Sequence, residues 1–245
     1  MNKQTKHRFS SRLRFGILAI ALILATPLCL AKGGQDGGGG GVIRCEKADG
    51  PTYERRVING EVVYIKVPPH SSLSHNRSFE LLDLWEAESG NGPFLGHLTT
   101  VPYDGSTPKA VQIDRAIKRL ASVDPAMAKD VQTYHAYVTQ RMFPAPAGDY
   151  VLAPEDTDVR FLPRGCSIEG LGSYSDRQDD LVYDAAIMKA LPPMDQAAFE
   201  IHEAVYKMLR VHQGATDSWQ TRRIVGLMFS AESFTSNDLI NGFHR

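Results

Sequence analysis

The sequence predicts an α+β fold in a single domain, on three observations. A β-hairpin pattern lies near the start of the folded region, a pair of amphipathic helices occupies the middle, and strongly periodic helices fill the C-terminal third. Strands and helices that come in separate runs are typical of the α+β class. Between the two groups of helices, short strands joined by loop-rich segments favour antiparallel pairing.

The first 31 residues have the organisation of a secretory signal peptide. The first fourteen residues contain five basic residues and no acidic residue, and an apolar run from Phe15 to Ala25 follows, as in the n-region and h-region of such signals. Small residues at positions 29 and 31 predict cleavage after Ala31. An uncleaved membrane anchor is one alternative, but the run is shorter than the roughly 20 residues that span a bilayer. A lipoprotein acylated at Cys29 is another.

Cleavage at that point predicts an acidic exported chain, located in the periplasm or outside the cell. It removes five of the 27 basic residues and none of the 28 acidic residues, which leaves a net charge of −6. Such a surface repels phosphate backbones, so we expect no nucleic acid among the partners. Nothing in the sequence forms a basic amphipathic helix for lipid headgroups, so we expect no stable membrane anchor after cleavage. The sequence does not identify any partner.

Two cysteines remain in the mature chain, Cys45 and Cys166. In an oxidising compartment, a pair without Cys or His neighbours at metal-ligand spacing indicates a disulfide. We therefore expect their Cα atoms to lie within about 7 Å of each other. Two buried free thiols are the alternative.

Residues 32–41 contain seven glycines in ten positions, which predicts a flexible linker ahead of a single domain over residues 42–245. A calcium-binding Gly-Asp repeat would need tandem copies, and the segment has one.

The first elements of the domain are predicted from turn and cap residues. Tyr53 to Ile58 and Glu61 to Val67 are β-rich runs separated by Asn59-Gly60, a dipeptide that favours a tight hairpin turn. Ser78 is a candidate N-cap for a short helix from Phe79 to Glu88. Gly90 to Gly105 is expected to be a loop.

Two helices are predicted in the middle of the chain. Ala110 to Val123 has apolar residues along one stripe. Asp124-Pro125 then has the residues of an N-cap and a first helical position, and the second helix should run to about Arg141. The short connection predicts an antiparallel pair. His135, in the second helix, is expected to be a packing residue.

The last part of the chain is predicted to hold four strands and three helices. The strands are expected at Tyr150–Leu152, Val159–Leu162, Ser167–Leu171 and Asp180–Tyr183. A helix from Met194 to His212 has a strong apolar stripe and a stop at Gly214. A helix from Ser218 to Phe229 with Asp217 as its cap follows, and a last short helix starts at Ser236.

Several of these segments resemble a known group of proteins. They are Cys45 after a Gly-rich start, Phe79 to Ala87, Gln196 to Tyr206 and Arg222 to Gly226. They resemble exported proteins of Gram-negative bacteria that have no assigned activity. The resemblance covers both ends of the mature chain and leaves residues 90–180 unmatched. It implies export and no particular chemistry.

His202-Glu203 is the one candidate for catalysis. A zinc peptidase helix would carry His-Glu-x-x-His, but the fifth position is Tyr206, and His212 lies about 15 Å along the helix. We therefore expect no metal and no cofactor, and a structural polar cluster in which Glu203 pairs with Arg222 or Arg223. The acidic residues of the segment from residue 79 to 88 are expected to form a solvated face.

These observations lead to two functional hypotheses. The first is a non-catalytic envelope or extracellular binding protein. The alternative is a metal-dependent hydrolase built around His202 and Glu203. An enzyme would need an opening beside His202, whereas a structural role would enclose the imidazole.

Overall fold

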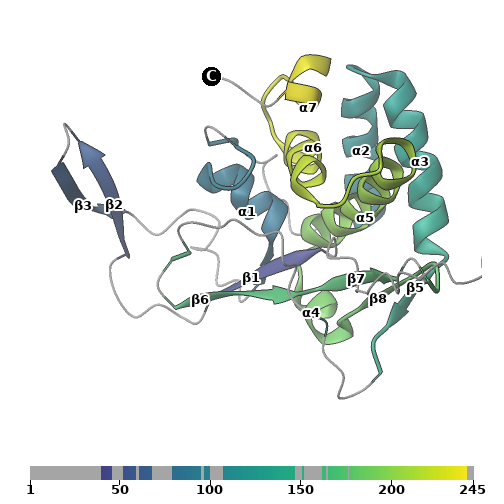
Figure 1. Ribbon diagram of the computed structural model, residues 1–245, viewed down its shortest axis with the longest axis horizontal. Coiled ribbons are helices and arrows are strands. Elements are labelled where there is room, and N and C mark those ends of the chain that lie inside the picture. The colour runs from purple at the N-terminus through teal and green to yellow at the C-terminus, as the bar shows by residue number, and fades with distance from the viewer. Residues whose placement is uncertain are drawn as a thin grey trace, which may run out of the picture. The chain divides into compact units, whose positions relative to one another are not determined.

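The computed structural model describes residues 40–45, 52–58, 61–67, 79–94, 97–99, 107–146, 151, 162–163, 165–175 and 177–241. All of them belong to one compact unit, residues 35–245. The described helices and strands confirm the α+β class. Figure 1 shows that most of the helices lie on one side of the strands β1, β6, β7 and β8.

The first sheet has three strands in the order β4-β1-β6, where β1 is Gly41–Cys45, β4 is Phe79–Leu81 and β6 is Cys166–Gly170. Both neighbours pair with β1 in the antiparallel sense. Gly41 already belongs to this strand, so the fold begins slightly before the expected position 42. The sheet brings residues from three distant parts of the chain together and places Cys45 opposite Cys166.

The predicted disulfide between Cys45 and Cys166 is present, with the two Cα atoms 4.0 Å apart. The alternative of two free thiols is therefore ruled out. A small apolar cluster of Ile43, Leu82 and Trp85 packs beside the two cysteines. The crosslink is thus built into the packing between the first sheet and the helix that follows β4.

The second sheet has the order β5-β8-β7, where β5 is Met142–Pro144, β7 is Gly172–Ser175 and β8 is Asp180–Tyr183. β7 and β8 are antiparallel; β8 is the strand expected at Asp180–Tyr183, whereas β7 had no predicted counterpart. β5 runs parallel to β8, which corrects the expectation of purely antiparallel pairing. β5 had no predicted counterpart, and its proline, Pro144, lies in an edge strand, where a missing N–H group is tolerated.

The N-terminal hairpin is formed as predicted. β2, Thr52–Ile58, pairs with β3, Glu61–Val67, in an antiparallel register that ends with Ile58 opposite Glu61. The Asn59-Gly60 turn itself lies outside the described residues.

The segment after residue 78 differs from the prediction. Phe79 to Leu81 are extended in β4, and the helix α1 covers only Leu82–Ser89. The backbone of β4 bonds to β1, so tertiary pairing outweighs the helical pattern. Ser78 lies outside the described residues, and Leu81 occupies the N-cap position. The residues described between positions 90 and 99 form neither helix nor strand, as expected for a loop.

The central helices are confirmed, with α2 at Lys109–Ala121 and α3 at Pro125–Thr139. Asp124 caps α3, since its side chain accepts a hydrogen bond from the N–H group of Met127 at 2.9 Å. α2 and α3 lie side by side at one edge of the molecule (Figure 1).

The helix α5, Pro193–Gln213, forms the centre of the core. It contacts α1, α2, α3, α6 and β4, and its apolar stripe is buried as predicted. Near its start, the ring of Phe199 fills the space beside two glycines. A Cβ atom at Gly40 or at Gly172 would lie 2.6 or 2.5 Å from that ring, so only glycine fits at both positions.

The C-terminal helices are α4, Ala185–Ala190, which had no predicted counterpart, α6, Trp219–Phe229, and α7, Ser236–Asn241. Gly214 ends α5 with a φ of 68°, in the left-handed conformation expected of a C-terminal glycine. Asp217 accepts a hydrogen bond from Trp219 N–H at 3.1 Å, although Ser218 is the N-cap of α6.

Several predictions fall where the structure gives no description. The signal sequence and its cleavage site after Ala31 lie outside the described residues, as do all but Gly40 and Gly41 of the expected linker. Most residues of the expected strands at 150–152 and 159–162 also lie outside the described residues. The two that are described, Val151 and Leu162, belong to no strand. Among the helices that are described, none has the length and apolar character needed to cross a membrane.

Candidate functional site

His202, the centre of the predicted candidate site, is enclosed in the core. Only 1% of its surface is exposed, and its Nδ1 atom lies 2.7 Å from Oδ2 of Asp83 on α1. Asp83 is itself fully buried. A carboxylate at Nδ1 fixes the tautomer and the orientation of an imidazole, an arrangement used in catalysis and also in packed helices. Here the surrounding helices leave the ring no exposed face.

Glu203 lies beside this pair and is equally enclosed. Its Oε1 atom accepts a hydrogen bond from the backbone N–H of Gly40 at 2.9 Å. The pKa of Glu203 is raised to about 7, chiefly because burial disfavours the charged form; His202 and the Gly40 N–H group lower it and the charge of Asp83 raises it, but none of these outweighs burial. This carboxyl group therefore changes its charge near neutral pH and fastens the residue that precedes β1.

The predicted pairing of Glu203 with Arg222 or Arg223 is wrong. Arg222 pairs with Glu86 of α1, with 2.9 Å between Nε and Oε2, and donates to the hydroxyl of Ser218 at 2.7 Å. Arg223 donates to the backbone carbonyl oxygens of Leu239 and Ile240. The four predicted residues are buried, but the contacts that hold them join different parts of the fold.

Three of the four acidic residues from position 79 to 88 are buried, which contradicts the expected solvated face, and Glu88 is partly exposed. Glu80, Asp83 and Glu86 are almost fully enclosed. The segment is fastened at three successive points: Leu81 N–H donates to Asp195 of α5, Asp83 meets His202, and Glu86 meets Arg222 of α6. The leucine, tryptophan and alanine residues of α1 are buried as well, so the helix is enclosed from Leu82 to Ala87 and is partly exposed only at its last residues.

A second polar cluster joins α2, α3 and α5. Oε2 of Glu200 lies 3.0 Å from Nε2 of His135, and Oε1 forms an ion pair with Lys109. Burial alone would raise the pKa of Glu200, but the hydrogen bonds from His135 and Lys109 outweigh it and lower the pKa. His135 is therefore a packing residue whose ring has a carboxylate hydrogen-bond partner, in agreement with the expected packing role.

A third cluster surrounds Asp179 in the turn between β7 and β8. Its carboxylate accepts hydrogen bonds from the hydroxyl groups of Tyr137 and Tyr174 and from Lys207 Nζ at 3.0 Å. Arg141 lies 3.4 Å away. The hydrogen bonds from Tyr137 and Tyr174 hold the pKa of Asp179 well below its usual range. The cluster anchors this turn to α3 and α5.

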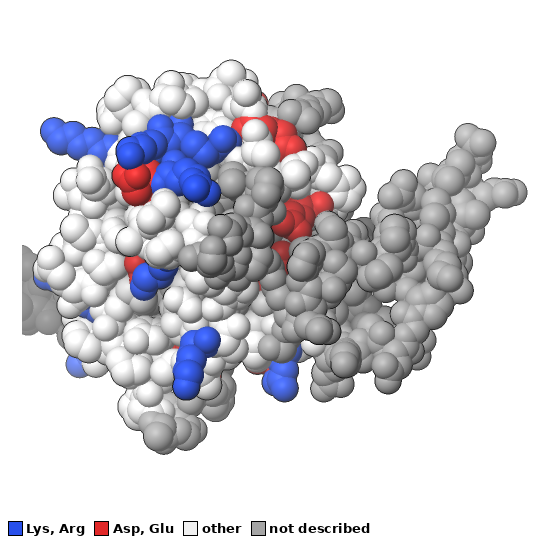
Figure 2. Space-filling view, turned by 180° about the vertical axis from the view of Figure 1, so that it is seen from behind, with Lys and Arg blue, Asp and Glu red and all other residues white. Residues whose placement is uncertain are grey.

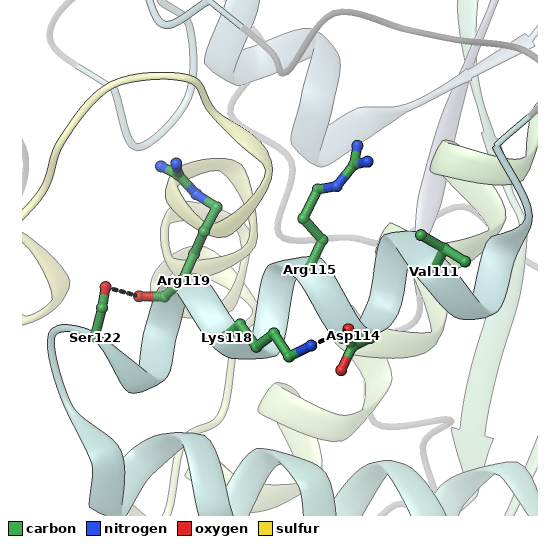
Figure 3. Close-up of a pocket in the computed structure, with 6 residues that line it drawn as sticks. All are labelled: Val111, Asp114, Arg115, Lys118, Arg119 and Ser122. Carbon is green, nitrogen blue, oxygen red and sulfur yellow. Dashed lines mark hydrogen bonds and ion pairs between the residues drawn. The ribbon is translucent and has the colours of Figure 1, made fainter.

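The described surface is hollowed along α2. An open groove of about 440 Å³ is lined by six residues of this helix and its end, namely Val111, Asp114, Arg115, Lys118, Arg119 and Ser122. Figure 3 shows Arg115 and Arg119 extending to the same side of the helix, while Lys118 turns toward Asp114. Seen from behind the view of Figure 1, the upper part of the molecule carries a group of Lys and Arg side chains (Figure 2).

Sequence reasoning missed this groove and the role of Asp83, Glu86 and Asp195. The groove had a signal in the spacing of Arg115 and Arg119, which lie one helical turn apart on one face. The sequence indicates the burial of the three acidic residues less clearly, through the strongly apolar segments in which they lie. Within the described ranges, no group of three or more His, Cys, Asp or Glu residues is arranged to hold a metal ion.

Comparisons with known proteins found no matching family model, no matching curated protein and no matching solved structure.

Proposed function

We propose that this chain is an exported binding protein of the periplasm or the cell exterior, and that the residues around His202 have no catalytic role. The observation that carries the proposal is the enclosure of His202 and Glu203. Each has a structural partner, the Asp83 carboxylate and the Gly40 N–H group, and neither faces solvent. A reaction at this pair would need a path for substrate and water.

Two further features support the location outside the cytoplasm. The Cys45–Cys166 crosslink is compatible with an oxidising compartment. The N-terminal sequence has the features of a cleaved signal. Mass spectrometry of the protein from an exporting host should therefore find a mature chain that begins at Lys32. A chain that keeps Met1 and stays with the membrane fraction would contradict export by cleavage.

The alternative is the metal-dependent hydrolase, and a melting experiment distinguishes the two functions. For the binding protein we expect the same melting temperature with and without a chelator and no stoichiometric metal by elemental analysis. A bound metal would stabilise the fold, so its removal would lower the melting temperature. Stoichiometric zinc together with such a fall would overturn the proposal. A His202→Asn variant that keeps its fold and loses the metal would place that metal at His202.

A further inference from the structure

The groove on α2 contains two arginines whose surroundings differ. The guanidinium of Arg119 is fixed, because it donates to the Glu232 carbonyl oxygen at 2.7 Å and lies 5.5 Å from the centre of the Phe234 ring. Arg115 is exposed and has no hydrogen bond or ion pair with the described residues. One of the two cations is therefore already positioned, while the other is available to a ligand.

The remaining residues limit what the groove can hold. Lys118 is neutralised by an ion pair with Asp114 at 2.7 Å, one helical turn away. Val111 provides an apolar surface at one end, and the hydroxyl of Ser122 is engaged by the Arg119 carbonyl oxygen at the other. The attractive charge is thus concentrated on the two arginines, which extend in the same direction (Figure 3).

Desolvation makes Arg119 a stronger partner for an anion than a surface arginine would be. Burial lowers the pKa of Arg119, because the charged form loses contact with water, although Glu232 partly compensates. An anion that reaches this side of α2 would replace some of the lost solvation. Its interaction with Arg119 would also be screened less than an interaction at a fully exposed site.

We infer that this groove binds a small molecule through a phosphate group held between Arg115 and Arg119. Guanidinium groups match the oxygens of phosphate in paired hydrogen bonds, and two of them balance a dianion better than the single charge of a carboxylate. The volume of about 440 Å³ suits a small ligand. The acidic charge of the mature chain disfavours a polyanion such as nucleic acid. This inference rests on the proposed binding function and names the class of ligand.

Isothermal titration of the mature protein with inorganic phosphate tests the inference, with acetate at equal ionic strength as the second probe. We expect saturable binding of phosphate and binding of acetate that is at least fivefold weaker. Arg115→Gln should weaken phosphate binding at least tenfold, while Arg115→Lys should have an intermediate effect because it keeps the charge and loses the paired geometry. Arg115 has no partner among the described residues, so these variants should fold normally.

Lys129→Gln is the matched control, since it removes an exposed cation from the neighbouring helix α3 outside the groove. It should change phosphate affinity less than twofold. Equal losses in Lys129→Gln and Arg115→Gln would indicate general charge attraction and overturn the inference. Phosphate binding that survives Arg115→Gln unchanged would also overturn it and move the site elsewhere, leaving the proposed binding function intact. If no phosphate binds at all, the inferred class of ligand is wrong. That result leaves the proposed function untouched, because the chelator experiment tests it independently.

Discussion

Glu203 makes the stability of the folded protein depend on pH. Its pKa is raised to about 7 by burial, from an ordinary value near 4.5. The folded protein therefore holds the Glu203 proton more tightly than the unfolded chain does. The contribution to stability is complete below about pH 4.5 and is lost as the pH rises to about 7. The loss is on the order of 3 kcal/mol.

The variant Glu203→Gln should remove this dependence. The amide oxygen still accepts from Gly40 N–H, but no charge has to be buried, so the variant should match the wild type at pH 4 and be more stable at pH 8. Urea unfolding at both values measures the difference. Asp114→Asn is a control, because this carboxylate is exposed and its ion pair with Lys118 contributes little. A variant that is less stable than the wild type at pH 8 would mean that the ionised carboxylate is required.

Gly40 offers a second test at the level of a single residue. A methyl group there would overlap the Phe199 ring, so Gly40→Ala should lower stability by about 1 to 3 kcal/mol. In a Phe199→Leu background the same substitution should cost less, because the obstructing ring is gone. Gly214→Ala is the comparison: nothing lies near that position, and its penalty comes from a positive φ. That penalty should be the same in both backgrounds, and chemical denaturation would show whether it is.

At the level of elements, the start of α3 and the end of α5 were predicted correctly. Asp124-Pro125 and Gly214 act through local geometry, which a sequence displays directly. The strands β4 and β5 were missed because each has only three residues and depends on partners far along the chain. The same reason explains the partner of Glu203. The group that binds Glu203 is a backbone N–H 163 residues away, which no side chain in the sequence indicates. An arginine on the next helix is a charged side chain and was therefore predicted in its place.

The ion pair between Glu86 and Arg222, which joins α1 to α6, can be tested by substitution. Replacing Glu86 by Leu leaves the buried Arg222 without its carboxylate, and such a change costs about 3 to 5 kcal/mol. Arg222→Leu should cost a comparable amount, and the double variant should cost less than the two together. Arg44→Leu is the control, since its pair with Glu169 is exposed and should contribute less than about 1 kcal/mol.

Hydrogen exchange provides the readout for α1. In Glu86→Leu, the amide protons of Leu82–Ser89 should exchange faster, with little change in α3, which has no part in this contact. Uniform acceleration over the described helices would indicate global destabilisation and would contradict a local role for the pair.

For the whole molecule, the disulfide has the largest expected effect on stability. Cys45 and Cys166 are 121 residues apart, and the chain-entropy model gives about 4 to 5 kcal/mol for a loop of that length. The double variant Cys45→Ser and Cys166→Ser should therefore have a lower midpoint of denaturation. Adding a reductant should lower the midpoint of the wild type and leave the double variant unchanged. A wild type that is indifferent to reduction would show that the crosslink adds no stability.

The position of the disulfide also determines what a protease can release. Every peptide bond between Cys45 and Cys166 lies inside the covalent ring that the crosslink closes, and this ring contains the hairpin β2-β3 and the helices α1, α2 and α3. A single cut anywhere in it opens the ring and still leaves one covalently connected molecule. Cleavage products would separate on a gel only after reduction. A chain cut once in this region thus keeps all its parts together for as long as the disulfide is not reduced.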